Sequence, residues 1–315
     1  MEARTVGSST LEVSIIGLGC NNFGIRSDEA TSLAVIGAAL DAGITHFDTA
    51  HNYGYGRSES ILGRALHNSR DDVVIATKFG GEAEQDPEFQ GASRRSIVRS
   101  CEDSLRRLQT DRIDLYYLHL PDPATPIDET LEALTELVSE GKVRYTGCSH
   151  LSGAEIDAAL QAAEQRQLSR FVTSQSEWNL LHRDIEADVV PACRRHGLGV
   201  IPYFPLASGM LTGKYQRGQP FPAGTRLAGS EYFQHEANEQ AFRTVERLSE
   251  FARLSGRSLA ELALSWLATH AEVASVIAGA THPAQVAENV KAAQSQLDTD
   301  ELAAIDDILS ADGDG

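Results

Sequence analysis

Cysteine is scarce in this 315-residue chain, and the few that occur are far apart. The four cysteines, at positions 20, 101, 148 and 193, are separated by 44 or more intervening residues. The sequence therefore contains neither a CxxC metal pair nor a dithiol redox motif, and no other metal-binding pattern. Scattered thiols of this kind are typical of small buried residues in a reducing compartment.

A basic surface is also missing, because 27 Lys and Arg stand against 45 Asp and Glu, giving a net charge of −18. Nucleic acids and anionic membranes are bound by basic faces, so we expect neither as a partner. No apolar run approaches the ~18 residues of a membrane span, and residues 1–13 lack the basic start and apolar core of a signal peptide. The expectation is a soluble, cytoplasmic protein.

What the chain does contain is a regular alternation of short β-rich runs and amphipathic segments of ten or more residues. The β-rich runs are residues 15–18, 45–47, 73–77, 113–118, 144–148, 171–175, 199–203 and 274–277. Helix signals fall between them, such as the apolar face of 127–140, a capping box at Ser152 to Glu155 and a helix start at Pro283.

Strands that alternate with crossover helices are parallel, and eight such units close into a (β/α)8, or TIM, barrel. No linker or change of composition divides the chain, so residues 1–315 are predicted to form one α/β domain. A short N-terminal β-hairpin precedes the barrel, and a long loop rich in Gly and Pro, 206–236, follows the seventh strand. Chemistry in such a barrel sits where the strands end.

Polar side chains stand at three consecutive strand ends. Asp48 closes the second run, with Tyr53 in the loop after it, and Lys78 and His119 close the third and fourth runs. Taken singly, each has an ordinary explanation: a helix-capping aspartate, a solvated lysine or a half-buried histidine. Together they form an acid–base set, because an ammonium beside a phenol stabilises the phenolate and lowers the phenol pKa. A carboxylate would keep that ammonium charged, and an imidazole would orient a carbonyl.

The motifs around these residues resemble those of the aldo-keto reductases. The stretch GITHFDTAHNYGYGRSESILGRAL is similar to that family's signature, LVSEGKVRYTGCSH to its second signature, and YLHLPDP to its histidine segment. The resemblance, from about Gly17 to Asn289, implies an oxidoreductase that passes a hydride between NADP(H) and the carbonyl of an aldehyde or ketone. It implies Tyr53 as the general acid/base, tuned by Lys78 and Asp48, with His119 orienting the carbonyl. His51 and Asn52 would shape the substrate pocket.

The same resemblance implies where a nicotinamide cofactor binds. Ser149, His150 and Gln175 match the positions that hold the carboxamide; His150 stands where the family often has asparagine, so altered contacts are expected there. Tyr203 would stack on the nicotinamide ring. The remaining predicted cofactor contacts are Phe204, Pro205, Leu206, Ser208, Gly209, Lys214, Arg226, Gly279, Thr281, Gln285, Glu288 and Asn289.

The choice between NADP(H) and NAD(H) depends on cations. Many relatives carry a Lys or Arg at positions matching 279–285, and this chain has none there. Potassium-channel β-subunits of the family supply cations from the long loop instead, at positions resembling Lys214 and Arg226. NADP(H) is therefore expected in preference to NAD(H), with no metal.

There are two alternatives to a reductase of this family. A doubly wound short-chain dehydrogenase needs Tyr-x-x-x-Lys, but none of the four lysines has a tyrosine four positions earlier, and GLGCNNFG (17–24) places its third glycine one position late for a dinucleotide fingerprint. A non-catalytic, cofactor-binding subunit on the same barrel stays open. The sequence leaves the carbonyl or alcohol substrate and the oligomeric state undetermined; Phe23, Phe79, Trp178 and Phe204 are candidates either for pocket walls or for core.

Overall fold

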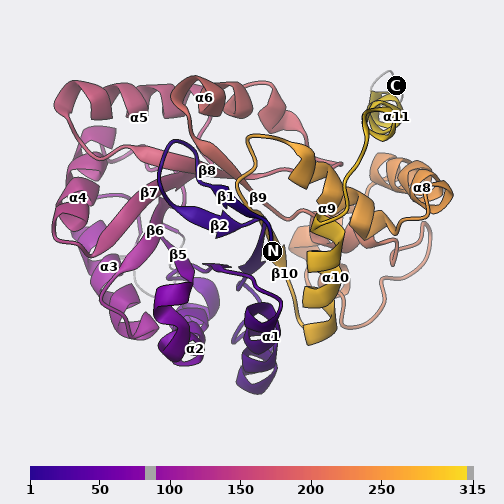
Figure 1. Cartoon of the computed structure of the whole chain (residues 1–315), viewed down its shortest axis with the longest axis horizontal. Coiled ribbons are helices and arrows are strands. Elements are labelled where there is room, and N and C mark those ends of the chain that lie inside the picture. The colour runs from indigo at the N-terminus through magenta and orange to yellow at the C-terminus, as the bar shows by residue number, and fades with distance from the viewer. Residues whose placement is uncertain (82–89, 311–315) are drawn as a thin grey trace.

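The computed structural model describes residues 1–81 and 90–310 and contains a barrel of eight parallel strands surrounded by helices (Figure 1). Around the sheet the strands follow the order β10-β3-β4-β5-β6-β7-β8-β9. Their bounds are β3 (Ile16–Gly19), β4 (His46–Asp48), β5 (Val74–Phe79), β6 (Ile113–Leu118), β7 (Val143–Ser149), β8 (Phe171–Glu177), β9 (Gly199–Tyr203) and β10 (Val276–Gly279). The predicted (β/α)8 barrel is confirmed.

The barrel closes between β9 and the residues that lead into β10. Val200 forms a parallel bridge with Val273, and its backbone N–H donates to the Glu272 carbonyl at 2.8 Å. The N–H of Ala274 returns a bond to the Val200 carbonyl at 2.9 Å. These bonds satisfy edge groups that an open sheet would leave unpaired.

Helices cover the outside of the barrel. They are α1 (Glu29–Asp41), α2 (Arg57–Leu66), α3 (Arg94–Leu108), α4 (Ile127–Ser139), α5 (Gly153–Arg166), α6 (Val189–His196), α7 (Arg226–Gly229), α8 (Glu239–Leu254), α9 (Leu259–Thr269), α10 (Pro283–Ala293) and α11 (Thr299–Ser310). The signals read from the sequence are present: α5 starts with the capping box of Ser152 and Glu155, and Pro283 is the first residue of α10. None of these described helices is both long and apolar enough to cross a membrane.

Alternation along the strands decides which side chains enter the barrel. Val74 and Ala76 of β5, like Leu115 and Tyr117 of β6, belong to the cluster inside the barrel, whereas Ile75 packs toward the helices. Successive side chains of a strand point to opposite faces. The same parity directs Lys78, two residues after Ala76, and His119, two after Tyr117, toward the barrel axis.

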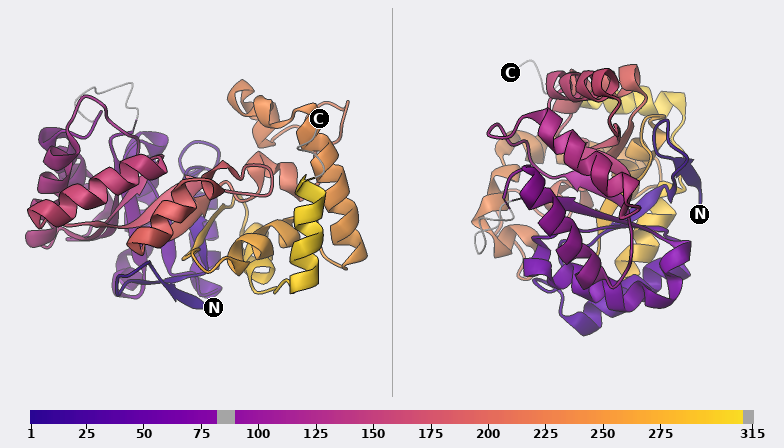
Figure 2. Two further views of the ribbon diagram at one scale, coloured as in Figure 1. Left: turned by 90° about the horizontal axis from the view of Figure 1, so that it is seen from above. Right: turned by 90° about the vertical axis from the view of Figure 1, so that its left-hand side faces the viewer.

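An N-terminal hairpin closes one end of the barrel. Its strands, β1 (Ala3–Thr5) and β2 (Glu12–Ser14), are antiparallel, as predicted. Buried Val6, Leu11 and Val13 pack in the same cluster as Val74 and Val172, which lie at the beginnings of their strands. The hairpin therefore covers the amino ends of the strands, and Figure 2 shows it on the side of the molecule where the N-terminus lies.

The long segment after β9 leaves from the opposite, carboxyl end. Three short helices interrupt it: η5 (Ala207–Thr212), α7 and η6 (Glu231–Glu236). Similar single-turn helices are η1 (Tyr53–Gly56), η2 (His67–Asp72) and η4 (Asp184–Glu186). Between β5 and α3, residues 82–89 lie outside the described residues.

Candidate active site

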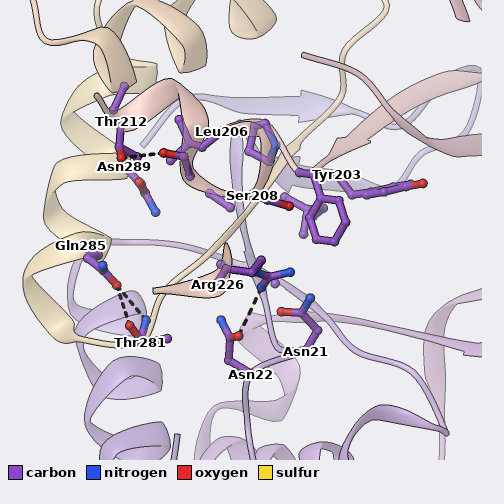
Figure 3. Close-up of a pocket in the computed structure, with 18 of the residues that line it drawn as sticks. Asn21, Asn22, Tyr203, Leu206, Ser208, Thr212, Arg226, Thr281, Gln285 and Asn289 are labelled. Atoms are coloured by element: carbon purple, nitrogen blue, oxygen red, sulfur yellow. Dashed lines mark hydrogen bonds between the residues drawn. The ribbon is translucent and has the colours of Figure 1, made fainter. Parts of the chain in front are cut away.

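A cavity of about 1060 Å³ occupies the carboxyl end of the barrel. Of the residues predicted to bind cofactor or act on substrate, all except Lys78 and Ser149 line it. Ten residues of its wall are labelled in Figure 3. The topology thus brings the polar strand ends together as predicted, with Lys78 and Ser149 fully buried behind the wall.

Asp48 and Lys78 form a buried ion pair, since Nζ of Lys78 donates to Oδ1 of Asp48 at 2.6 Å and to the Thr49 carbonyl at 2.8 Å. The second carboxylate oxygen, Oδ2, accepts a bond from Nε2 of Gln175 at 2.7 Å. Burial alone would lower the pKa of Lys78, but Asp48 and Tyr53 outweigh it and raise that pKa. Lys78 is therefore a fixed positive charge at the base of the cavity.

Tyr53 reaches this charge through an unusual turn. Gly54, Tyr55 and Gly56 all have left-handed backbone conformations, with φ of 58°, 57° and 81°. At Gly54 a Cβ atom would also lie 2.9 Å from the Phe23 carbonyl oxygen, so glycine is required there. This turn explains the glycines after Tyr53 and holds its ring with Nζ of Lys78 5.0 Å from the centroid.

The pKa of Tyr53 differs from the sequence expectation. Burial raises it above its ordinary value of 10, although the Lys78 ammonium acts in the opposite direction; Asp48 adds to the rise. The prediction of a lowered phenol pKa is wrong for the net shift, because the sequence could not weigh desolvation against the ammonium. The phenol therefore keeps its proton at neutral pH.

His119 faces Tyr53 with its ring nearly perpendicular, at a centroid distance of 6.0 Å. Burial, assisted by the nearby Lys78 charge, holds the pKa of His119 well below its usual value, so the imidazole is neutral. Its buried Nδ1 has no hydrogen-bond partner among the described residues. A neutral imidazole in this position can hydrogen-bond a polar ligand atom without adding charge.

His150 connects several predicted residues. Its Nδ1 lies 2.9 Å from both the Ser149 hydroxyl and the His119 carbonyl oxygen, and its Nε2 lies 2.9 Å from the hydroxyl of Tyr203. Ser149 thus contacts His150 rather than the cavity. Tyr203 lines the wall from the end of β9, where a flat ligand could stack on its ring.

The loop after Tyr203 is conformationally strained. Phe204, Ala207 and Ser208 have φ of 49°, 44° and 54°, in the left-handed region that residues with a Cβ rarely occupy. Such strain concentrates at functional sites. Ser208 is nearly buried in the cavity wall, and its hydroxyl has no partner among the described residues. This polar atom requires a ligand or solvent partner.

Two cations from the long segment line the same cavity. The guanidinium of Arg226 lies 5.0 Å from the ring centroids of both Phe204 and Phe233, and it donates to Oδ1 of Asn22 at 3.3 Å (Figure 3). Burial and the nearby Arg26 lower the pKa of Arg226. Lys214 folds over Gly209, where a Cβ would lie 2.5 Å from its Nζ. Among the described residues neither cation has a carboxylate partner, so both are available to an anion.

The far end of the cavity is formed by β10 and α10. The five residues predicted to contact the cofactor there line it: Gly279, Thr281, Gln285, Glu288 and Asn289. Oε1 of Gln285 accepts the backbone N–H of Thr281 at 2.8 Å, which ties the strand-to-helix turn to the first turn of α10 (Figure 3). His282, the N-cap of α10, was not singled out in the sequence.

Several lining residues were missed. Asn21, Asn22 and Arg26 follow β3 and belong to the cavity wall, although GLGCNNFG is only a near-miss for a dinucleotide fingerprint. The rule that strand ends carry the site would have found them if it had been applied to the first strand. Of the four aromatic candidates for pocket walls, Phe23, Phe79 and Trp178 are core residues and only Phe204 lines the cavity.

The fold and the cavity define the class of this protein: a parallel α/β barrel with ionisable side chains around a cavity at the carboxyl ends of its strands. Its family follows from comparison with known proteins. The model described as "Aldo/keto reductase family" matches residues 15–310. The chain belongs to this family, as its motifs suggested, and is an oxidoreductase of the aldo-keto reductase type, a family that uses nicotinamide cofactors.

Individual relatives cover nearly the whole chain. It is 38% identical to the "Probable voltage-gated potassium channel subunit beta" of Oryza sativa subsp. japonica over 93% of this chain and 91% of that protein. It is 36% identical to "Aldo-keto reductase YhdN" of Bacillus subtilis (91% and 87%) and 34% identical to "L-glyceraldehyde 3-phosphate reductase" of Escherichia coli K12 (99% and 93%).

Proposed function

We propose that this protein reduces an aldehyde or ketone with NADPH, and oxidises the corresponding alcohol in reverse, with Tyr53 as the general acid/base. The observation that carries the proposal is the position of Nζ of Lys78, 2.6 Å from Asp48 and 5.0 Å from the ring centroid of Tyr53. NADPH, when bound, supplies the hydride. The protein supplies the proton, from Tyr53, and the positive charge of Lys78 that stabilises the phenolate left behind.

Tyr53 is suited to the acid role because burial keeps its proton in place at neutral pH. When a carbonyl oxygen takes that proton, a phenolate remains beside the Lys78 ammonium. The attraction between the two charges arises only as the proton leaves, so it favours the transition state over the ground state. Lys78 thus acts on the product of proton transfer rather than on the resting phenol.

Asp48, Gln175 and His119 support this step. Asp48 keeps Lys78 charged and fixed, and Gln175 holds the Asp48 carboxylate by its second oxygen. His119, kept neutral by burial, is placed across from Tyr53 to hydrogen-bond the carbonyl oxygen. The carbonyl would then lie between two polar groups that fix its orientation for hydride arrival.

The residues around the cavity fit the cofactor. The unpartnered Ser208 hydroxyl and the strained loop at 204–209 suit a diphosphate, and Tyr203 suits a nicotinamide ring. Lys214 and Arg226 offer two unneutralised charges in a chain of net charge −18. Because one extra phosphate distinguishes NADP(H) from NAD(H), these cations support a preference for NADP(H).

Tyr53→Phe tests the proposal. It removes the proton and leaves the ring, so kcat for reduction of a reactive aldehyde, followed at 340 nm, should fall roughly 10²–10⁴-fold. NADPH affinity should stay close to that of the wild type. Tyr55→Phe is the matched control, because Tyr55 lies two residues away and is 64% exposed; it should leave turnover unchanged. Wild-type turnover in Tyr53→Phe would refute the role.

A second candidate is a cofactor-binding regulatory subunit. The observation that favours it is the 38% identity to a protein named as a probable potassium-channel β-subunit. In this case the cavity would bind NADPH, but a panel of aldehydes and ketones would cause no loss of absorbance at 340 nm. Measurable turnover with any of them favours the reductase.

A further inference from the structure

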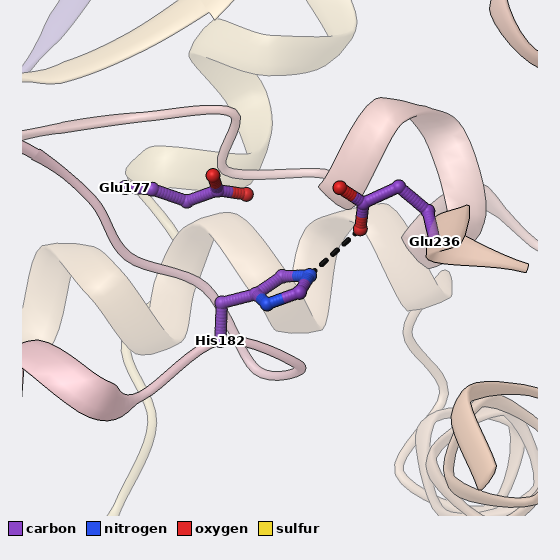
Figure 4. A group of neighbouring side chains, drawn as sticks. All are labelled: Glu177, His182 and Glu236. Atoms are coloured by element: carbon purple, nitrogen blue, oxygen red, sulfur yellow. Dashed lines mark hydrogen bonds and ion pairs between the residues drawn. The ribbon is translucent and has the colours of Figure 1, made fainter. Parts of the chain in front are cut away.

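A second group of side chains converges at the wall of the cavity, which Glu177 lines, and lies outside the proposed proton-transfer residues. It consists of Glu177, the last residue of β8, His182 in the following loop, and Glu236, the last residue of η6 (Figure 4). One ligand atom from each lies within 4.8 Å of the others. Nothing in the proposed reductase chemistry uses these three residues, which will be called the Glu–His–Glu cluster.

We propose that the Glu–His–Glu cluster binds a divalent transition-metal ion, with Zn²⁺ as the best match to its ligands. The site joins the barrel to the end of the long segment after β9.

The first argument is an unsatisfied carboxylate. Oε1 of Glu177 is buried and has no hydrogen-bond partner among the described residues. Buried polar atoms are nearly always paired, and a lone carboxylate oxygen is among the most costly to leave unpaired. Glu236, only 5% exposed, adds a second carboxylate nearby. Two acids facing one small volume call for a cation between them.

The imidazole that faces them is already in a ligating position. Nε2 of His182 lies 2.7 Å from Oε2 of Glu236, so these two atoms share a proton in the metal-free protein. His235 also approaches Glu236, with its Nε2 3.3 Å from Oε1. A divalent ion would take the place of the shared proton and would also satisfy Glu177.

The loop that carries His182 is held in place. Oδ1 of Asn179 accepts the backbone N–H groups of Leu181 and His182 at 2.9 and 3.0 Å. Nδ2 of Asn179 donates to the Phe204 carbonyl at 3.1 Å. The imidazole is therefore presented by a tight turn that is anchored to the strained loop of the cavity wall.

The ligand set selects the metal. Ca²⁺ and Mg²⁺ prefer oxygen ligands alone, and Cu(I) prefers sulfur. One imidazole and two carboxylates suit Zn²⁺, which binds nitrogen and oxygen at ~2.0–2.2 Å in a tetrahedral arrangement, with water in the fourth position. The three ligands come from two segments separated by more than fifty residues, so no spacing motif in the sequence reveals them.

The experiment is a titration of the full-length protein, freed of adventitious metal by a chelator, with Zn²⁺ by calorimetry and with Co²⁺ by visible absorption. We expect one ion per chain, a four-coordinate Co²⁺ spectrum and a higher thermal midpoint with Zn²⁺. Absence of saturable binding would overturn the proposal.

Variants locate the site. Glu177→Gln and His182→Gln should weaken Zn²⁺ binding at least tenfold and abolish the Co²⁺ band. His196→Gln is the matched control: it removes an imidazole whose Nε2 lies 2.8 Å from Oδ1 of Asp157, outside the cluster, and should leave binding unchanged. Without metal, Glu177→Gln should melt no lower than the wild type, because it removes a buried unpaired charge. Wild-type affinity in both cluster variants would refute the assignment. Turnover of aldehydes plays no part in these readouts.

Discussion

The imidazole of His150 accepts a hydrogen bond from the hydroxyl of Tyr203 across the cavity wall, with 2.9 Å between Nε2 and the oxygen. The direction follows from the other side of the ring. Nδ1 lies 2.9 Å from the His119 carbonyl oxygen, which can only accept, so Nδ1 carries the proton and Nε2 is the acceptor. The single N–H of His150 is thus engaged with the protein backbone. From the sequence, His150 was expected to contact the nicotinamide carboxamide, but its N–H is already bonded to the His119 carbonyl.

This pair predicts energetic coupling between His150 and Tyr203. Tyr203→Phe and His150→Asn should each reduce kcat/KM, but the double variant should lose less than the sum of the two. A coupling of about 1 kcal/mol is expected for one hydrogen bond. The measurement is a double-mutant cycle in NADPH-dependent reduction at pH 7.5, and strictly additive losses would show that the two side chains act independently.

The Asp48–Lys78 pair predicts a large effect on stability. Lys78→Met leaves the Asp48 carboxylate buried without a counter-charge, so the free energy of unfolding should fall by about 3–5 kcal/mol. The double variant Asp48→Asn/Lys78→Met removes both charges and should recover much of that loss, while remaining inactive. Urea unfolding followed by circular dichroism checks both; equal destabilisation of the single and double variants would contradict this account.

His46 predicts a stability loss in mild acid. It is fully buried beside Ser275, and burial lowers its pKa to about 4. In the unfolded chain the imidazole has a pKa near 6.5 and binds a proton that it does not bind in the folded protein. The free energy of unfolding therefore falls as the pH decreases from 6.5 to 4. This titration lowers the free energy of unfolding by about 3 kcal/mol across that pH range. His46→Asn preserves the bond to Ser275 and should flatten this part of the pH profile of urea unfolding; an unchanged slope would assign the effect elsewhere.

Charge reversal tests the basis of cofactor preference. Lys214→Glu and Arg226→Glu should each weaken NADPH binding more than NADH binding, by at least tenfold in the ratio of the two dissociation constants. Lys142→Glu serves as a control, since Lys142 pairs with Glu102 and Glu140 away from the cavity. Equal losses for both cofactors would discredit the assignment of these cations to the extra phosphate.

The sequence predicted those parts of the site that depend on strand order and on strand ends. Asp48, Tyr53 and His119 meet because neighbouring parallel strands deliver them to one rim, and this follows from topology alone. The strands extend up to two residues further than predicted, to Phe79, Glu177 and Gly279, since pairing with neighbours continues beyond the apolar runs.

What the sequence could not predict depends on distances between segments far apart in the chain. The rise of the Tyr53 pKa results from the balance of burial against the Lys78 charge, and composition carries no measure of burial. Similarly, the bonds from Gln175 to Asp48 and from Arg226 to Asn22 link residues 127 and 204 positions apart. Such contacts arise from how loops pack on the finished barrel.

The hairpin of β1 and β2 bears on the end of the barrel from which ligands enter. Val6, Leu11 and Val13 cover the amino ends of the strands, whereas the cavity lies at their carboxyl ends. If the proposed cofactor and substrate both enter this cavity from the carboxyl ends of the strands, whichever binds deeper must bind first and leave last. Removal of residues 1–14 would expose the apolar amino ends of the strands to water and lower the stability of the fold, without touching any side chain that lines the cavity.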